Sequence, residues 1–251
     1  MIKSSRVMKN FEQYVKKYDM NNNNIKANYF HSLKVMELSS DIATTIGLFN
    51  EEEIAVVELI ALFHEIANFD VAPNYKMEQE DVEDFALKSA ELLFSNGVLR
   101  KISDDTKYDN VIKLAIYACN KNGLPANIDP KTAAFCKILR DAHRIDSFRK
   151  ILNYPVIDTR ITMFPSNMVY DRFKQFKVID KKLSENNSDE VLVALSEIFN
   201  LNYRYSYAVL KRSGYVDKII ESLSFSEKNL EVFYKQIGKV LNAYIDRKIG
   251  E

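Results

Sequence analysis

The feature that most constrains the fold is the length of the segments that glycine and proline do not interrupt. The 251 residues include only six glycines and five prolines, and between them apolar residues recur at three- and four-residue spacing. This spacing gathers apolar side chains on one face of an α-helix, whereas a half-buried strand alternates. The sequence therefore predicts an all-α, multi-helix bundle, and no segment has a convincing strand or hairpin pattern.

The predicted helices extend from one end of the chain to the other. The segment 51–69 is apolar around nearly its whole circumference, which predicts a central helix surrounded by others. Asp129-Pro130 places a cap residue and a first-turn proline where a helix should begin. The expected helices, with ends placed to within a few residues, span about 4–18, 24–46, 51–69, 79–96, 106–120, 130–152, 166–178, 188–200, 203–222 and 226–248.

The domain organisation follows from the amphipathic character of the later helices. The segment from Ser184 to Asp189 is the most linker-like part of the chain. It does not divide the chain into independent domains, because the C-terminal helices need a neighbour against which to pack their apolar faces. We expect one domain over 1–251, with a core at 10–150 and a C-terminal helical extension, 151–251, packed on it.

Charge and composition exclude several classes of protein. The 35 basic and 35 acidic residues cancel and are interleaved, which is typical of solvated helix faces and gives no indication of a nucleic-acid polymer as partner. No apolar run approaches the roughly 20 residues that span a bilayer, and the start lacks a signal-peptide core. Cys119 and Cys136 have no metal-type spacing, so we expect free thiols, a cytoplasmic location and no membrane association.

The three histidines, His31, His64 and His143, all lie in predicted helices rather than loops. His64 is followed by Glu65 within the apolar segment 51–69. A carboxylate beside an imidazole in such a segment costs free energy unless the pair is hydrogen-bonded or holds a ligand. This pair is therefore the first candidate for a functional site.

The sequence around each histidine resembles the HD-domain metal-dependent phosphohydrolases, an all-helical family defined by His … His-Asp … Asp. The last segment is similar to a form from one bacterial branch, Leu-Arg-Asp-Ala-Asp-Lys-Leu-Asp, and Ile198-Phe199-Asn200-Leu201-Asn202-Tyr203 resembles that branch as well. The resemblance covers about residues 10–150 and implies an HD-like bundle. Its motifs are Phe30-His31-Ser32-Leu33-Lys34-Val35, Leu62-Phe63-His64-Glu65-Ile66-Ala67 and Ile138-Leu139-Arg140-Asp141-Ala142-His143-Arg144-Ile145-Asp146.

The chain departs from the family at the residues that hold metal. The resemblance implies that His31 and His64 are kept, that Glu65 replaces the Asp of the pair, and that His143 replaces the final Asp. In relatives with a second metal, the matching positions are Phe85, which cannot ligate, and Cys119. The Gly and the Lys or Arg that usually follow the His-Asp pair are replaced by Ala67 and Asn68. A two-metal site is therefore not expected.

Two interpretations of these substitutions remain open. In the first, His31, His64, Glu65 and His143 converge as three nitrogens and one oxygen, a set that suits Zn, Fe, Co or Ni and is poor for Mg. One such ion with an open position lowers the pKa of bound water from 15.7 to about 7 and polarises a phosphoryl oxygen. In the second, the site has decayed, no metal is bound, and the histidines are polar residues of a helical core.

Other side chains are weaker candidates with plain structural alternatives. Arg144 is the expected phosphate contact, or else a member of a salt bridge. Asp141 and Asp146 orient His143 in one interpretation and pair with nearby arginines in the other. Cys119 and Cys136 behave more often as small buried apolar residues than as ligands or reactive thiols. Aromatic residues that suggest base stacking are expected to pack between helices instead: Phe11, Tyr14, Tyr18, Tyr203, Tyr205 and Tyr207.

Three functions are consistent with these features. The first is a divergent single-metal phosphohydrolase of the HD type, acting on a small phosphate ester or nucleotide, with Glu65 and Arg144 as catalytic candidates. The second is a non-catalytic HD domain that binds a ligand or a protein partner. The third is iron-dependent oxidation, which the lack of a convincing second-metal site disfavours.

Overall fold

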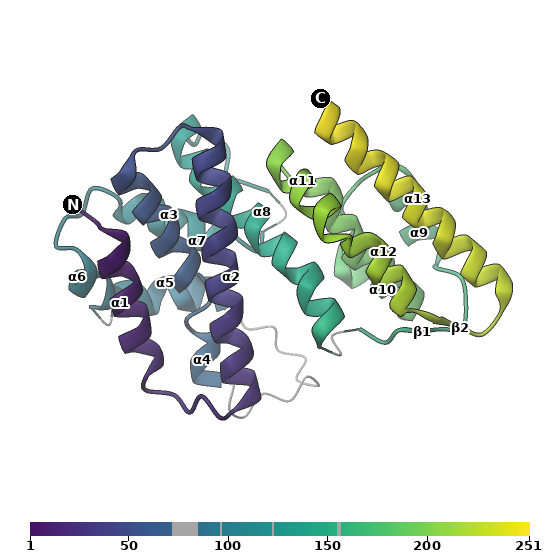
Figure 1. Cartoon of the computed structure of the whole chain (residues 1–251), viewed down its shortest axis with the longest axis horizontal. Coiled ribbons are helices and arrows are strands. Elements are labelled where there is room, and N and C mark those ends of the chain that lie inside the picture. Colours follow the sequence, from purple (N-terminus) through teal and green to yellow (C-terminus); the bar gives the residue numbers. More distant parts are fainter. Residues whose placement is uncertain (72–84, 96, 122, 155–156) are drawn as a thin grey trace. The chain divides into compact units, whose positions relative to one another are not determined.

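The computed structural model describes residues 1–71, 85–95, 97–121, 123–154 and 157–251. Within these ranges the protein is all-α apart from two strands of two residues each (Figure 1). It forms two compact units, Met1–His143 and Arg144–Glu251. No helix in the described ranges is long and apolar enough to cross a membrane.

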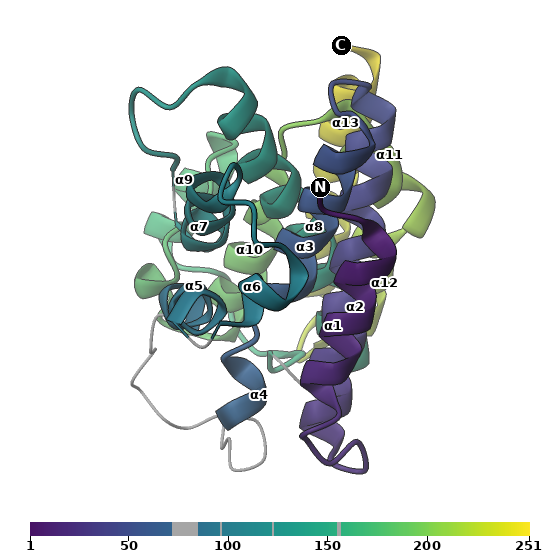
Figure 2. The same cartoon turned by 90° about the vertical axis from the view of Figure 1, so that its left-hand side faces the viewer.

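The N-terminal unit is built around one buried helix. α3 packs against α1, α2 and α7, and α5 packs against α6 and α7 (Figure 2). Nearly every side chain from Ala55 to Phe63 is buried, which confirms the predicted central position of this helix. The elements of the unit are α1 (Ser4–Val15), α2 (Asn23–Ile46), α3 (Glu51–Phe63), α4 (Asn68–Val71), α5 (Phe85–Ser95), α6 (Val98–Ile102), α7 (Asp109–Ala118) and the first part of α8 (Pro130–Asn153).

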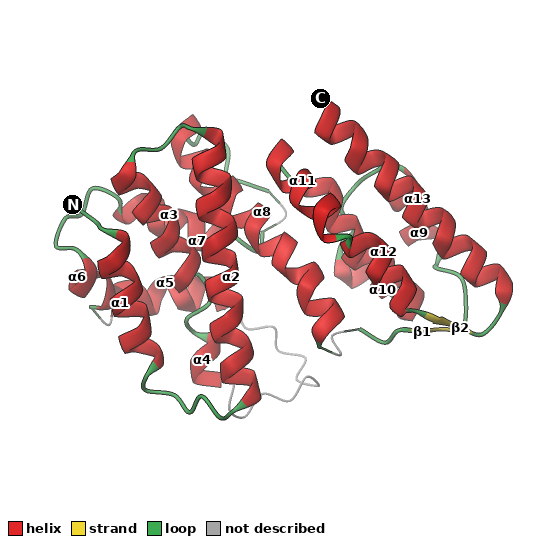
Figure 3. Ribbon diagram, viewed as in Figure 1, coloured by secondary structure: helices red, strands yellow, loops and turns green. Residues whose placement is uncertain are grey.

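In the C-terminal unit, α13 packs against α11, α12 and β2, and α10 packs against α9 and β1. The strands pair in parallel, with Arg160 opposite Ser224 (Figure 3). The unit contains the end of α8, β1 (Arg160–Ile161), α9 (Asn167–Lys174), a 3-10 turn at Lys181–Leu183, α10 (Asn187–Ser196), a 3-10 turn at Glu197–Asn200, α11 (Arg204–Ser213), α12 (Tyr215–Ser222), β2 (Ser224–Phe225) and α13 (Lys228–Gly250).

Most of the expected helices are present, and the start of α8 is confirmed in detail. Pro130 is its first residue, and the Asp129 carboxylate accepts a hydrogen bond from the backbone N–H of Thr132 at 2.9 Å. This bond satisfies one of the amide groups that the first turn of a helix leaves without an intrahelical partner. The expected start of a helix at about 79 lies outside the described residues.

Four predictions about the elements were wrong. The helix expected at 51–69 ends at Phe63, and the one expected at 203–222 is divided at Gly214, which has a φ of 62°. The linker-like segment from Ser184 to Asp189 is ordered: the Asn186 side chain caps α10, and Asp189 is fully buried. The expectation of no strands missed β1 and β2, because two residues are too short to show an alternating pattern.

Candidate metal centre

The segment that follows α3 gives the site its shape. His64 is the C-terminal cap of α3, and the chain then forms successive tight turns in which the N–H of Ile66 bonds to Phe63 and that of Asn68 to Glu65. These are bonds to the third residue back, as in a 3-10 helix, and they rotate the side chains away from the α-helical phase. The prediction that His64 lies within a helix was therefore wrong, and this pair projects from a helix end.

His31 and His143 come from helices that pass this turn. His31 lies on the buried face of α2, in a stripe with Ile25, Val35 and Leu38, and its side chain is 1 % exposed. His143 lies on α8, and 19 % of its side chain is exposed. The helical spacing that builds the core of α2 thus also carries an imidazole to the end of α3.

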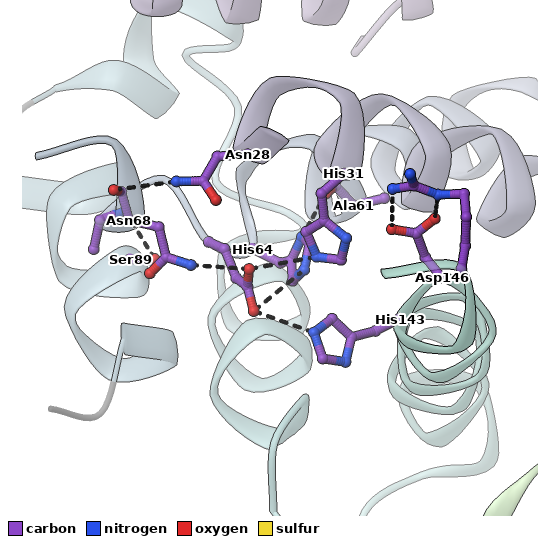
Figure 4. A network of polar contacts seen from close by, with 11 residues as sticks. Asn28, His31, Ala61, His64, Asn68, Ser89, His143 and Asp146 are labelled. Carbon is purple, nitrogen blue, oxygen red and sulfur yellow. Dashed lines mark hydrogen bonds and ion pairs between the residues drawn. The ribbon is translucent and has the colours of Figure 1, made fainter. Parts of the chain in front are cut away.

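The four side chains converge on one point (Figure 4). The His31 and His64 ring centroids are 5.2 Å apart, and each lies 5.3 Å from that of His143. The Nε2 atoms of His31, His64 and His143 lie 3.4, 3.9 and 3.1 Å from the nearest carboxylate oxygen of Glu65. Among the described residues, this is the one group of His, Cys, Asp or Glu side chains that meets the geometry of a metal site.

The tautomer of His64 is fixed by the backbone. Its Nδ1 lies 2.7 Å from the carbonyl oxygen of Ala61, and a carbonyl oxygen only accepts, so Nδ1 carries the proton and donates it. Nε2 therefore presents a lone pair, and this atom is buried without a hydrogen-bond partner. A histidine that ligates a metal commonly has its second nitrogen held in this way.

The charges in the cluster suit a cation. The pKa of His64 is lowered to about 3, chiefly by burial and further by the imidazoles of His31 and His143, against the opposing effect of Glu65. Burial alone would raise the pKa of Glu65, but its interactions with the three histidines together outweigh burial and hold that pKa well below its ordinary value. At neutral pH the cluster therefore contains an ionised carboxylate and a neutral His64.

These residues fit a transition-metal ion. Three imidazole nitrogens and one carboxylate oxygen are ligands that Zn and the neighbouring transition metals accept. The buried Nε2 of His64 has a lone pair for a metal ion and no hydrogen-bond partner in the fold. The ligand atoms lie within 4.8 Å of one another. Tetrahedral coordination at about 2.1 Å places ligand atoms about 3.4 Å apart, so binding requires shifts of about 1 Å at the side-chain ends.

The remaining candidates have other contacts. The Nε of Arg144 pairs with Glu197 at 2.7 Å, and the side chain is 9 % exposed. Asp146 binds Arg149 through both of its oxygens, as the salt-bridge alternative predicted. Cys119 and Cys136 are buried and neither forms a disulfide. Burial raises the pKa of Cys136 to about 11, in agreement with the small apolar residue predicted there.

One residue of the site received no role from the sequence. The side-chain amide of Asn68 donates to Oε2 of Glu65 at 3.0 Å. In the sequence Asn68 stands out only where the family pattern has a cation, and its spacing of three residues from Glu65 was the available signal for its role.

No protein-family model, curated protein or solved structure matches this chain.

Proposed function

We propose that this protein is a divergent HD-type phosphohydrolase that holds one divalent transition-metal ion. The ion is Zn, Fe, Co or Ni, and its ligands are His31, His64, Glu65 and His143. The observation that carries the proposal is the buried Nε2 lone pair of His64, directed at an ionised carboxylate and flanked by two further imidazoles. The HD-like fold and the substrate class, a small phosphate ester or nucleotide, rest on the resemblance in the sequence.

A bound divalent ion would supply Lewis-acid chemistry, since it lowers the pKa of water to about 7 and polarises a phosphoryl oxygen. The residues of the chain determine the charge, the ring orientation and the burial of the site. Glu65 provides the single negative charge of the ligand set, and the Ala61 carbonyl holds the His64 ring in one orientation. His31 and His64 are fully buried, whereas 12 % of the Glu65 side chain and 19 % of the His143 side chain are exposed, so the cluster is more open on the side of these two residues.

A second function, binding without catalysis, is favoured by one specific observation. Arg144 is the predicted phosphate contact, and its Nε is engaged by Glu197 at 2.7 Å. Asn68 occupies the position at which the family resemblance leads us to expect a second cation. With one cation paired to Glu197 and the other replaced by Asn68, a retained metal would hold a ligand or a protein partner rather than promote hydrolysis.

The deciding experiment is metal analysis of protein purified without an affinity tag or chelator. We expect close to one equivalent of Zn, Fe, Co or Ni, and loss of most of it in His64→Ala and His143→Ala. Cys119→Ala is the matched control, because Cys119 is a buried thiol outside the cluster and its removal should leave the metal content unchanged. Metal retained by both histidine variants would contradict the site.

Activity separates the two functions. Metal-loaded protein is assayed against a panel of phosphate esters with Mn, Co and Ni, with His31→Ala as the background. Hydrolysis above that background supports the phosphohydrolase. A full metal content with no hydrolysis on the panel favours the binding function, and restoring Asp at positions 65 and 143 then asks whether activity returns.

A further inference from the structure

The side-chain amide of Asn68 faces back toward Glu65 across the tight turn. Asn68 is the first residue of α4, and both its backbone N–H and its Nδ2 bond to Glu65, the first to the carbonyl oxygen and the second to Oε2, each at 3.0 Å. Figure 4 shows the Nδ2 contact beside the three imidazoles. The amide is thus the polar group that holds the carboxylate from the side opposite the histidines.

The backbone around Asn68 is held by two other helices. Nδ2 of Asn28, on α2, donates to the carbonyl oxygen of Asn68 at 3.3 Å. The hydroxyl of Ser89, on α5, accepts a hydrogen bond from the N–H of Ala67 at 3.1 Å. Because both contacts involve the backbone, they fix the place of the segment without depending on the amide of Asn68.

The oxygen of the Asn68 amide, unlike its nitrogen, makes no hydrogen bond. Oδ1 of Asn68 is buried without a hydrogen-bond partner. An acceptor in this state lowers the stability of the folded protein. Exchanging the amide oxygen and nitrogen by rotation would not be favourable, because Oδ1 would then face the Glu65 carboxylate and both groups only accept hydrogen bonds. Glu65 therefore sets the orientation of the Asn68 amide. The bond from Nδ2 to Glu65 is kept although Oδ1 is left without a partner, which lowers the stability of the folded protein.

The two oxygens of Glu65 consequently differ. Oε1 lies 3.1 Å from Nε2 of His143 and 3.9 Å from Nε2 of His64, and it faces these two rings. Oε2 lies 3.4 Å from Nε2 of His31 and also accepts the bond from Asn68. A carboxylate with one oxygen occupied by a hydrogen bond presents the other as the stronger ligand.

We propose that Asn68 is a positioning residue that makes Glu65 a one-oxygen ligand, so that the ion is held by three nitrogens and one oxygen. This inference rests on the metal site proposed above. A four-ligand set suits Zn and Co, and during catalysis water would enter as a fifth ligand. Release of Oε2 would instead let the carboxylate bind through both oxygens and occupy that fifth position. Asn68 would thereby replace the cation of the family pattern with a residue that controls the geometry of the site.

The test uses cobalt as the probe, because the visible absorption of Co²⁺ is strong in four-coordinate sites and weak at higher coordination numbers. Metal-free protein is titrated with Co²⁺, and affinity and spectrum are recorded for the wild type and for Asn68→Ala. We expect intense four-coordinate bands in the wild type. In the variant we expect weaker bands and about a 10-fold loss of affinity, the lower end of the range for a partner of a metal ligand.

Three further proteins complete the test. Asn68→Asp places an acceptor where the donor was, so it should lose more affinity than Asn68→Ala. Asn68→Ser keeps a donor and should recover part of the wild-type spectrum. Asn28→Ala removes the contact to the backbone of Asn68 and leaves the contact to Glu65, so its spectrum should match the wild type. Circular dichroism of each metal-free variant checks that it folds.

The outcomes separate the two proposals. Cobalt bound by the wild type, with the same spectrum and affinity in Asn68→Ala, overturns the role of Asn68 and leaves the metal site standing. No cobalt bound by the wild type overturns the metal site and the role of Asn68 together. If Asn68→Ala does not fold, Asn68→Ser decides: bands stronger than those of Asn68→Asp support the role of the donor, and bands as weak as those of Asn68→Asp contradict it.

Discussion

Both compact units bury polar side chains, but they use them differently. In the C-terminal unit, Asp189 accepts hydrogen bonds from the backbone N–H groups of Ser166 and Glu185, at 2.8 and 3.0 Å. Tyr234 donates to the carbonyl oxygen of Ser188 at 3.0 Å. In the N-terminal unit, the three imidazoles and Glu65 face one another, and Nε2 of His64 is buried without a partner.

Burial alone therefore does not mark a functional site. Asp189 is as deeply buried as His64, yet its oxygens satisfy backbone groups that the fold would otherwise leave without partners. The His64 lone pair satisfies nothing in the fold, which is a cost unless a ligand uses it. The groups that accept or donate these hydrogen bonds therefore distinguish a structural cluster, Asp189 and Tyr234, from the candidate functional cluster, His31, His64, Glu65 and His143.

The largest effect on stability should come from the structural cluster. Asp189→Ala leaves two backbone N–H groups without their acceptor, and we expect a loss of about 3 kcal/mol in the free energy of unfolding. Urea denaturation measures it. The cobalt affinity of the variant should equal that of the wild type, because Asp189 belongs to the other unit. A variant that weakens metal binding while leaving stability intact would reverse the assignment of the two clusters.

A smaller effect should follow from pH, in the metal-free protein. The pKa of His64 is about 3 in the folded state and 6.5 ordinarily, so between these values the unfolded chain binds a proton that the folded one does not. Stability is therefore full above pH 6.5 and is lost as the pH falls toward 3, by about 1.4 kcal/mol at pH 5.5 for this one group. Glu65, whose pKa is also lowered, adds a loss in the same direction at lower pH.

Denaturation at pH 7.5 and pH 5.5 measures this dependence, and His64→Gln provides the comparison. The variant should lose less stability on acidification than the wild type, since glutamine does not titrate. Tyr234 of the C-terminal unit should not contribute, because its pKa is raised to about 12, far from the acid range, chiefly by burial. Equal acid dependence in wild type and variant would mean that His64 does not stay neutral in the folded state.

The sequence predicted the helical class, the central position of α3 and the four residues of the cluster. These depend on local periodicity and on the order of the motif, both of which are visible in one dimension. His31 was placed by the order of the family motif, and in the structure it lies among the buried residues of α2. The turn after Phe63 could not be, since it contains no glycine or proline and arises from a switch to hydrogen bonds with the third residue back.

The misjudged linker shows a second limit. Serine, asparagine and aspartate are typical both of exposed linkers and of helix caps, so composition alone does not separate the two. In the structure Asn186 caps α10, and Asp189 turns inward to bind the backbone of Ser166, which is distant in sequence. Only this long-range contact distinguishes a buried cap from a solvated segment. The role of Asn68 was missed for a related reason, since it depends on the orientation of one amide.

The smallest expected effect concerns Gly214, where a predicted continuous helix divides into α11 and α12. Its φ of 62° lies in the left-handed region, and a Cβ added there would meet nothing closer than Lys218 Cε at 3.9 Å. Gly214→Ala should therefore cost only the backbone strain, about 1 kcal/mol. Gly250→Ala, in open space near the end of α13, is the control and should cause no loss. Wild-type stability in Gly214→Ala would mean that the division at this residue is not required by the fold, and an altered cobalt affinity would mean that the two units are coupled.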